Sequence, residues 1–237
     1  MFTRPHHQRI AKVLESLDAG LLKQHNCLFA GGTAIALGYG EYRESVDIDF
    51  LVSDLVSYRY LRNSVREQGL QALMKSTDAS QLQTSDTRSD QYGIRTKVFV
   101  EGKPIKFEIV LEGRIGLAKP GKKDCILGVA SLTKLDMAAS KLLANSDRGL
   151  DMGMHCRDVI DLAMLNLSKS EFAEAAIKGE AAYGEAIFKD LAKVIDMLGE
   201  ANGLLERCMK AMDVSVPRAF LWQNISKLKI FLDDVIS

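Results

Sequence analysis

The stretch CLFAGGTAIALGYGEYRESVDIDFLV, residues 27–52, contains the signals that decide the fold. It begins with a short apolar run that ends in paired glycines, which predicts a buried strand followed by a turn. The next residues, TAIALGYG, predict a short helix that stops at Gly38 and Gly40. VDIDFLV then alternates acidic and apolar residues, which predicts a second strand. This order of strand, glycine turn, helix and acidic strand organises the N-terminal half.

Asp47 and Asp49 lie two residues apart on the second predicted strand. Because side chains alternate between faces, both carboxylates point to one side, while Ile48 and Phe50 point into a core. Two neighbouring carboxylates repel each other and lose hydration, which a divalent cation would offset. Glu108, in the later run IKFEIVL, has the same apolar flanks. It joins the aspartates if its strand pairs beside VDIDF. The alternative for each acid is a solvent-facing position on a half-exposed sheet.

Gly31, Gly32 and Thr33 form the turn between the first strand and the helix. Paired glycines allow backbone N–H groups to approach a phosphate, and a helix N-terminus adds partial positive charge. Thr33 is predicted to cap the helix or to bind a phosphate oxygen. The alternative is a plain strand-to-helix turn, because the sequence here fits neither the P-loop pattern nor GxGxxG.

The remaining N-terminal residues predict helices over about 5–24 and 56–74 from their apolar spacing. GIRTKVFV and IKFEIVL, separated by Glu101–Pro104, predict a β-hairpin, and CILGVA predicts one more short strand. We therefore expect an α/β domain with a mixed sheet over residues 1–130.

From Ser131 onward the sequence predicts a helical domain, over residues 131–237. The fold class is thus α+β: an α/β-type N-terminal half with a mixed sheet and flanking helices, then a C-terminal helical bundle. The helices are expected at about 131–146, 155–167, 170–180, 184–200, 203–212 and 217–235.

Charged residues of the helical half form a second pattern. Lys134, Lys141 and Arg148 are spaced by seven, which places them on one helix face. This cationic stripe either grips a triphosphate or is a solvated face. Arg157 and Asp161 are i,i+4 neighbours, which favours an intrahelical ion pair as the structural alternative.

The segment GGTAIALGYGEYRESVDIDF resembles the nucleotidyltransferase superfamily typified by DNA polymerase β. Within that superfamily it resembles the abortive-infection toxins of AbiEii/AbiGii type. Arg43, Ser45, Asp47 and Asp49 match the family's Arg-x-Ser/Thr-x-Asp-x-Asp pattern. KLLANSDR and RDVIDL match two later helices of these toxins, K-L-x-A-x-x-x-R and R-D-x-x-D-L. The resemblance covers about residues 27–167, and Glu108 departs from the aspartate that is commoner at the third acid.

The resemblance implies an Mg²⁺-dependent enzyme, with Mn²⁺ as the alternative ion, that uses a nucleoside triphosphate. It implies that Lys141 binds a nucleotide phosphate and that the aspartate of the later helix has a structural or base-assisting role. The expected catalytic residues are Asp47, Asp49, Glu108, Lys141 and Asp158, of which the first three would hold the metal. The expected nucleotide-binding residues are Gly31, Gly32, Thr33, Arg43, Ser45, Lys141, Arg148 and Arg157.

Three functions follow for such a chain. The resemblance implies a toxin of a toxin–antitoxin or phage-defence pair that modifies RNA such as tRNA and has a separate antitoxin. The second is a nucleotidyltransferase with a small, aminoglycoside-like acceptor. The third is a binding module that keeps the fold without the chemistry. The three differ in the acceptor and in whether metal and nucleotide bind.

Composition narrows these choices only slightly. The 31 basic and 31 acidic residues give a net charge of zero, which argues against extensive polyanion binding and mildly favours a small acceptor. A basic patch would favour RNA. The four cysteines are far apart and no long apolar run occurs, so we expect a cytoplasmic protein without a membrane partner. His6 and His7 are expected at the surface. The lysines that would form the basic patch are Lys97, Lys103, Lys106, Lys119, Lys122 and Lys123.

Overall fold

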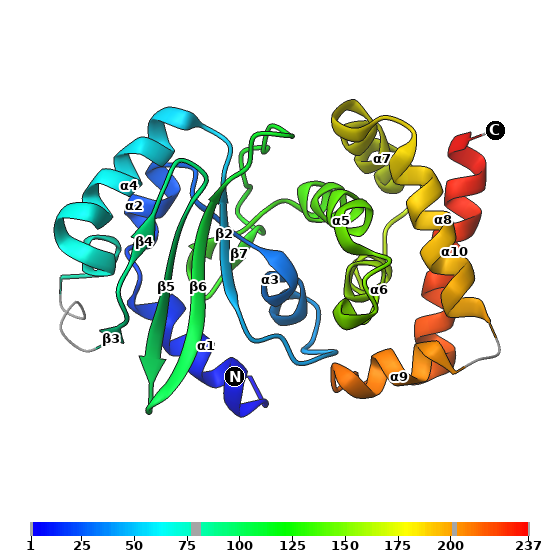
Figure 1. The fold of residues 1–237 in the computed structure, drawn as a ribbon, viewed down its shortest axis with the longest axis horizontal. Coiled ribbons are helices and arrows are strands. Elements are labelled where there is room, and N and C mark those ends of the chain that lie inside the picture. The colour runs from blue at the N-terminus through cyan, green and yellow to red at the C-terminus, as the bar shows by residue number, and fades with distance from the viewer. Residues whose placement is uncertain (1, 77–81, 201–202, 237) are drawn as a thin grey trace. The chain divides into compact units, whose positions relative to one another are not determined.

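The chain divides into two compact units in its computed structural model, which describes residues 2–76, 82–200 and 203–236 (Figure 1). Unit 1 comprises Met1–Glu41 and Ser45–Thr133. Unit 2 comprises Tyr42–Glu44 and Lys134–Ser237. The division therefore falls three residues beyond the boundary expected near Ala130. Tyr42–Glu44 leaves unit 1 for three residues in the middle of the deciding stretch, which the sequence analysis did not predict.

A mixed sheet forms the centre of unit 1, as predicted. Its strand order is β1-β2-β6-β5-β3, and β4 also pairs with β5. Among the strand pairs of this sheet that the structure describes, β2 and β6 run parallel and the others are antiparallel. The predicted hairpin is confirmed as β5 and β6. The strands are β1 (Leu28–Ala30), β2 (Ile48–Val52), β3 (Gln83–Thr84), β4 (Arg88–Ser89), β5 (Gly93–Val100) and β6 (Lys103–Leu111).

The helices of unit 1 follow the expected order, but both long helices are divided. The one expected over about 56–74 ends at Gln68 and is followed by a 3₁₀ turn. The single helix expected over about 5–24 is two helices, because the Asp18 side chain accepts the Leu21 N–H and caps a new helix. Figure 1 shows the first helix behind the β5–β6 hairpin, and it contacts β5. The helices are α1 (Pro5–Ser16), α2 (Ala19–Gln24), α3 (Gly31–Gly38), α4 (Leu55–Gln68) and the 3₁₀ turn η1 (Gly69–Leu73).

CILGVA forms a small two-stranded hairpin of its own rather than one strand of the main sheet. β7 (Cys125–Ile126) pairs antiparallel with β8 (Val129–Ala130). Leu127 and Gly128 make the turn, and both have positive φ angles. A two-residue connection with positive φ at both positions is the usual geometry of a tight hairpin.

The core of unit 1 lies on one face of the sheet. Ile48, Phe50 and Phe107 are fully buried. The rings of Phe29, Phe50 and Phe107 form a row with centroids 5.5 Å apart. Each strand thus presents alternate residues to this apolar layer and leaves the intervening residues for the opposite face.

The regular elements described in unit 2 are all helices, and the helices expected there are confirmed to within a few residues at their ends. The clearest start is that of α7, where Ser168 and Glu171 form a reciprocal capping box. None of the helices in the described residues is long and apolar enough to cross a membrane. The elements are α5 (Lys134–Arg148), η2 (Met152–Met154), α6 (Arg157–Met164), α7 (Lys169–Tyr183), α8 (Ala186–Gly199), α9 (Leu204–Ala211) and α10 (Arg218–Ile236).

Candidate active site

Carboxylates gather on the face of the unit 1 sheet that lies opposite its apolar core. Asp49 on β2 is in register with Glu108 on β6, which is in register with Arg95 on β5. Neighbouring strands lie about 4.8 Å apart, so these three residues form one row across the sheet. Asp47 and Asp49 are both partly exposed, while Ile48 between them is fully buried. The predicted placement of both aspartates on one face, with Glu108 beside them, is therefore present.

Gly31 brings the start of α3 against the Asp49 carboxylate. Its φ of +73° is a conformation that favours glycine, and a Cβ at this position would lie 2.5 Å from Asp49 Oδ2. Glycine is thus required for two separate reasons. Because α3 begins at Gly31, its first N–H groups have no partners within the helix. The turn predicted from the paired glycines is consequently part of the acidic site rather than a remote connection.

Thr33 and Ser45 hold the chain that leads into β2. The Thr33 hydroxyl lies 2.8 Å from Ser45 Oγ and 2.5 Å from the carbonyl oxygen of Asp47, and both side chains are buried. Thr33 is not the cap of α3, because the cap position is Ala30. These contacts give the two hydroxyls a positioning role, and their expected contact with a phosphate stays a prediction.

His7 supports the same segment, and its expected position at the surface is wrong. The side chain is fully buried. The N–H of Ser45 donates to His7 Nε2 at 3.1 Å, and His7 Nδ1 donates to the Glu41 carboxylate at 2.8 Å. His6 is the more exposed of the two, and its ring donates to the carbonyl oxygen of Val46. Both histidines therefore fix backbone just before Asp47.

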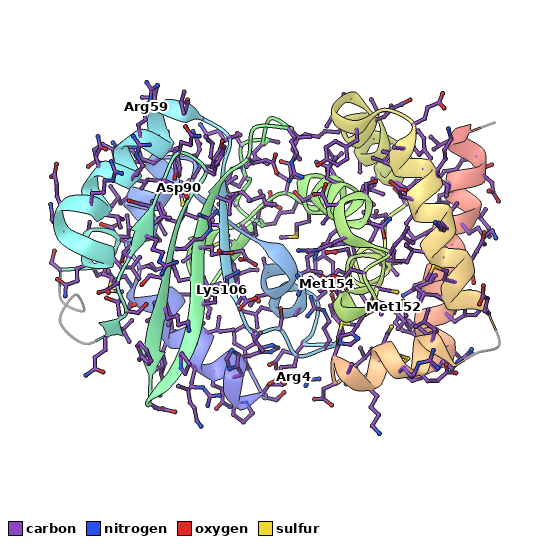
Figure 2. All side chains as sticks on the ribbon, viewed as in Figure 1. Arg4, Arg59, Asp90, Lys106, Met152 and Met154 are labelled. Carbon is purple, nitrogen blue, oxygen red and sulfur yellow. The ribbon has the colours of Figure 1, made fainter. Side chains whose placement is uncertain are left out.

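Two cations border the carboxylates, and the sequence analysis assigned neither of them to the site. Lys106 lies 2.6 Å from Glu108 Oε2, and Arg95 Nε lies 3.2 Å from Glu108 Oε1. Partial desolvation lowers the pKa of Lys106, but the carboxylates of Glu108, Asp47 and Asp49 together raise it by more. The pKa of Lys106 therefore lies above its ordinary value. Lys106 is visible on β6 in Figure 2. The alternation of Lys106 with buried neighbours on β6 was the available signal.

Asp47 and Asp49 have the chemistry that Mg²⁺ or Mn²⁺ requires. Hard divalent ions prefer carboxylate oxygens, and Mg²⁺ is typically held by one or two of them. Among the residues that the structure describes, however, no three His, Cys, Asp or Glu side chains gather closely enough to share a metal ion. Glu108 is held by Lys106 and Arg95, so its role as the third ligand stays a prediction. The two aspartates alone fit the ion.

A second charged cluster lies inside unit 2 and centres on Asp161, which is fully buried. Arg43 binds it with two parallel hydrogen bonds, Nε to Oδ1 at 2.6 Å and Nη2 to Oδ2 at 2.8 Å. The Tyr42 hydroxyl donates to Oδ1 at 2.5 Å, and Lys141 Nζ lies 2.6 Å from Oδ2. Such a bidentate guanidinium–carboxylate pair is among the strongest polar contacts in proteins. It anchors Tyr42–Glu44 in unit 2.

Asp158 extends this cluster along α6. Its carboxylate accepts from Lys141 at 2.8 Å and from two nitrogens of Arg148 at 2.8 and 3.0 Å. Burial alone would raise the pKa of Asp158, but Lys141 and Arg148 lower it well below its usual range. The pKa of Asp161 is likewise lowered, because Arg43 and Lys141 outweigh the effect of its burial. Both acids are therefore ionised and paired.

These contacts correct two expectations for the helical half. The intrahelical ion pair between Arg157 and Asp161 is absent from the described contacts, because Asp161 binds Arg43 and Lys141 instead. The stripe on α5 is not a solvated face either, since Lys134 lies 2.8 Å from Glu171 and Lys141 is buried. The expected phosphate contacts of Arg43, Lys141 and Arg148 stay predictions, and they now compete with carboxylates.

Arg157 differs from the other cations of this cluster. It is partly buried, and the structure gives it no hydrogen bond or ion pair to any residue that it describes. Burial and the nearby Arg148 lower its pKa, although Asp158 opposes them. A desolvated guanidinium beside other cations is an unfavourable arrangement that an anion would relieve.

The comparisons with known proteins assign the chain to a family. Residues 13–221 match the family described as nucleotidyl transferase AbiEii toxin, Type IV toxin–antitoxin system. No match to a curated protein was found.

Two solved structures share the fold. JHP933 from Helicobacter pylori is 16% identical, with 99% of this chain and 93% of that chain covered and a TM-score of 0.52. MenT4, a nucleotidyltransferase toxin from Mycobacterium tuberculosis H37Rv, is 15% identical, with 98% and 86% covered and a TM-score of 0.52. Because the family match spans most of the chain, this protein belongs to the AbiEii nucleotidyltransferase toxin family.

Proposed function

We propose that this nucleotidyltransferase moves a nucleotidyl group from a nucleoside triphosphate to an RNA acceptor such as tRNA, as the toxin of a toxin–antitoxin pair. The observation that carries the proposal is the shared face of Asp47 and Asp49 beside Gly31, where a carboxylate meets the start of a helix. Two acids that leave the core and border a turn suited to phosphate form a site for metal and triphosphate together.

Asp47 and Asp49 would hold Mg²⁺ or Mn²⁺ in this proposal. When bound, the ion supplies the charge that screens the triphosphate and favours attack by the acceptor hydroxyl. Thr33 and His7 contribute indirectly, because their hydrogen bonds to Asp47 O and to Ser45 N–H fix the segment that carries the aspartates. These buried polar side chains thus position the aspartates and would not touch the metal themselves.

The phosphates would bind to donors that already surround the acids. The N-terminal N–H groups of α3, at Gly31 and Gly32, are suited to phosphate oxygens. Lys106 provides a positive charge on the same face of the sheet. Glu108 pairs with Lys106 and orients it, and becomes a metal ligand only if that pair opens. In the reaction the acceptor oxygen forms the new bond to phosphorus, and pyrophosphate leaves.

In unit 2 the proposal retains the nucleotide contacts that the family resemblance implies. Arg157 is the strongest candidate there, because its guanidinium has no partner among the described residues. Lys141 and Arg148 would exchange part of their contact with Asp158 for a phosphate. Asp158 would then hold the two cations in place, a positioning role that is compatible with its lowered pKa.

The acceptor and the partner rest on family membership more than on geometry. A family described as a Type IV toxin–antitoxin system favours a separate antitoxin for this chain. The balanced charge of the whole chain favours a small acceptor instead. These two outcomes, and the absence of any transfer, are separated by one experiment.

That experiment incubates total RNA, or a panel of small aminoalcohols, with each α-³²P-labelled nucleoside triphosphate and Mg²⁺. We expect the wild-type protein to label RNA and Asp47→Asn to label it at least about a hundredfold less, because the metal contributes several kcal/mol to the transition state. Glu15→Gln, which removes an exposed carboxylate on α1, is the matched control and should retain full activity.

The pattern of labelling decides among the three functions. Label on small acceptors alone replaces RNA with the second acceptor class. Absence of label from the wild-type protein with all four nucleotides and both acceptor classes removes the proposed activity and favours a binding module.

A further inference from the structure

A groove in unit 1 is lined by four arginines, of which only Arg95 also belongs to a cluster described above. It lies between α4 and the ends of β5 and β6 and has a volume of about 890 Å³. We call it the arginine groove and define it by Arg59, Arg62, Arg95, Arg114 and Tyr92. Arg59, on α4, is labelled in Figure 2, as is Asp90, which precedes β5. All of these residues belong to unit 1.

The arginine groove has an excess of positive charge. Glu112 is the only acid among the residues that the structure assigns to its lining, and its carboxylate is held by Arg114 at 2.7 Å. Arg59 and Arg62 have no hydrogen bond or ion pair to the residues described in this structure. The Nε atom of Arg62 is buried, and none of the described residues accepts a hydrogen bond from it. A buried donor without a partner is costly, and an anionic ligand in the groove would offset that cost.

Tyr92 adds a flat apolar surface at the edge of this groove. It is one of the most exposed aromatic residues of the chain, at 65%. The turn that carries it is nevertheless well held, because Asp90 Oδ1 accepts the N–H groups of Tyr92 and Gly93 at 2.7 and 3.0 Å. The Tyr58 hydroxyl ties the same turn to α4 through the carbonyl oxygen of Asp90. An exposed aromatic ring beside arginines, carried on a turn whose backbone is held, is the combination that binds unpaired bases.

Arg95 connects the groove with the carboxylate row. It lines the groove and lies 3.1 Å from Asp90 Oδ2 and 3.2 Å from Glu108 Oε1. Glu108 in turn is in register with Asp49. The groove and the carboxylate row therefore share Arg95.

We propose that the arginine groove binds a single-stranded nucleic acid, with Arg59 and Arg62 on backbone phosphates and Tyr92 stacked on a base. That this strand is the acceptor rests on the proposed function, whereas the binding itself does not. An acidic protein would also bind the arginines, but it would not make use of the exposed aromatic ring of Tyr92 beside them. The groove thus supplies a local positive surface that the net charge of zero conceals.

Fluorescence anisotropy with short labelled single strands of RNA and of DNA tests this proposal. Each phosphate contact with a single strand contributes about 0.7 to the slope of log K against log salt concentration. Arg59→Ala/Arg62→Ala should therefore make the slope shallower by about 1.4 and weaken binding at least about tenfold. The control Lys193→Ala/Lys227→Ala removes the same charge from exposed positions in unit 2 and should bind as the wild type does.

Tyr92 provides an independent readout. Tyr92→Ala should weaken binding about fivefold or more, because the stacked base loses its platform, whereas Tyr92→Phe should retain wild-type affinity. If the groove variants lose affinity for RNA alone, RNA is the ligand. If they lose affinity equally for RNA and DNA, the groove binds single strands of either kind. The proposal is overturned if the wild type binds neither strand or if the arginine variant matches the lysine control. A labelled acidic peptide is titrated in parallel. The proposal is also overturned if the groove variants lose only the binding of that peptide.

The same variants separate this proposal from the proposed function. Asp47→Asn should keep its affinity for the strand and lose nucleotidyl transfer. If the wild type binds through the groove but transfers no label, the groove stands and the activity falls. If RNA is labelled and Arg59→Ala/Arg62→Ala changes neither affinity nor KM for RNA, the activity stands and the groove falls.

Discussion

The two charged clusters of this protein use the same residue types in opposite ways. On the sheet of unit 1, Asp47 and Asp49 are partly exposed. Two cations contact Glu108, and their side chains are also exposed, Lys106 at 50% and Arg95 at 42%. In unit 2, Asp158 and Asp161 are buried. The acids of the first cluster are therefore open to a ligand, whereas the two acids of the second are already paired with cations. A motif of acids and cations does not by itself distinguish a binding site from a structural network.

The cost of removing an acid should differ most between the clusters. Asp161→Ala leaves Arg43 and Lys141 buried without their shared carboxylate, and we expect it to lower the free energy of unfolding by about 3–5 kcal/mol. Asp47→Ala relieves repulsion at a half-exposed position and should change the same quantity by less than about 1 kcal/mol. Urea unfolding followed by circular dichroism measures both values.

The coupling between the partners of Asp161 sharpens this test. In a double-mutant cycle, Arg43→Ala and Asp161→Ala should be strongly non-additive, because either change alone leaves a buried charge unpaired. Equal losses of stability in Asp47→Ala and Asp161→Ala would remove the distinction between an open and a satisfied cluster.

The next largest effect concerns the glycine that touches Asp49. Gly31→Ala and Gly40→Ala both place an alanine at positive φ, which costs about 1–2 kcal/mol in each case. Only at position 31 does the new Cβ meet a neighbour, because nothing lies within 4 Å of the corresponding atom at Gly40.

Gly31→Ala should therefore displace the Asp49 carboxylate and reduce nucleotidyl transfer about a hundredfold, the scale of a 1 Å misplacement at an active site. Gly40→Ala should lose a similar amount of stability and keep most of its activity. The rate of label transfer and the unfolding midpoint, measured for both variants, check this pair. Equal activities would show that the contact between Gly31 and Asp49 is irrelevant to catalysis.

Acid should weaken unit 2 through its paired aspartates. The folded-state pKa of Asp158 and that of Asp161 both lie below the unfolded value, so their contribution is complete above about pH 4. This contribution to stability is lost as the pH falls from the unfolded-state pKa through the folded-state pKa, because the unfolded chain binds more protons than the folded one in that range. Each carboxyl contributes a slope of up to about 1.4 kcal/mol per pH unit in that window.

Asp158→Asn lacks one of these groups, so its stability should fall less steeply with acid than that of the wild type. Urea midpoints between pH 5 and pH 2, each within about one or two units of the unfolded pKa, measure the two slopes. Identical slopes would show that Asp158 is not the group that titrates.

The sequence was sufficient for those parts of the molecule in which neighbours along the chain decide the structure. Alternation around Ile48 and Phe107 predicted two strands and the face that carries the acids. Other contacts join residues that are distant in sequence. Arg43 and Asp161 are 118 residues apart, and His7 and Ser45 are 38 apart. No periodicity relates such partners, so the sequence predicts neither contact, and the surface position expected for His7 is wrong.

The arginine groove was missed for a related reason. The lysines that suggested a basic patch lie between positions 97 and 123, whereas the groove combines α4 with the ends of β5 and β6. Tyr92 is unremarkable as one aromatic residue in a polar turn. Its position beside Arg95, and that of Arg59 and Arg62 across the groove, is a property of the fold. The net charge of the whole chain does not reveal such a local positive surface.

Direct measurement of metal binding tests the central claim, that the open cluster of unit 1 is the metal site and the closed cluster of unit 2 is not. Mn²⁺ titrations followed by electron paramagnetic resonance would compare the wild type, Asp47→Asn/Asp49→Asn and Asp158→Asn, each shown to be folded by circular dichroism. We predict that the wild type and Asp158→Asn bind Mn²⁺ alike and that the double variant loses this binding. Wild-type affinity in the double variant would contradict the account.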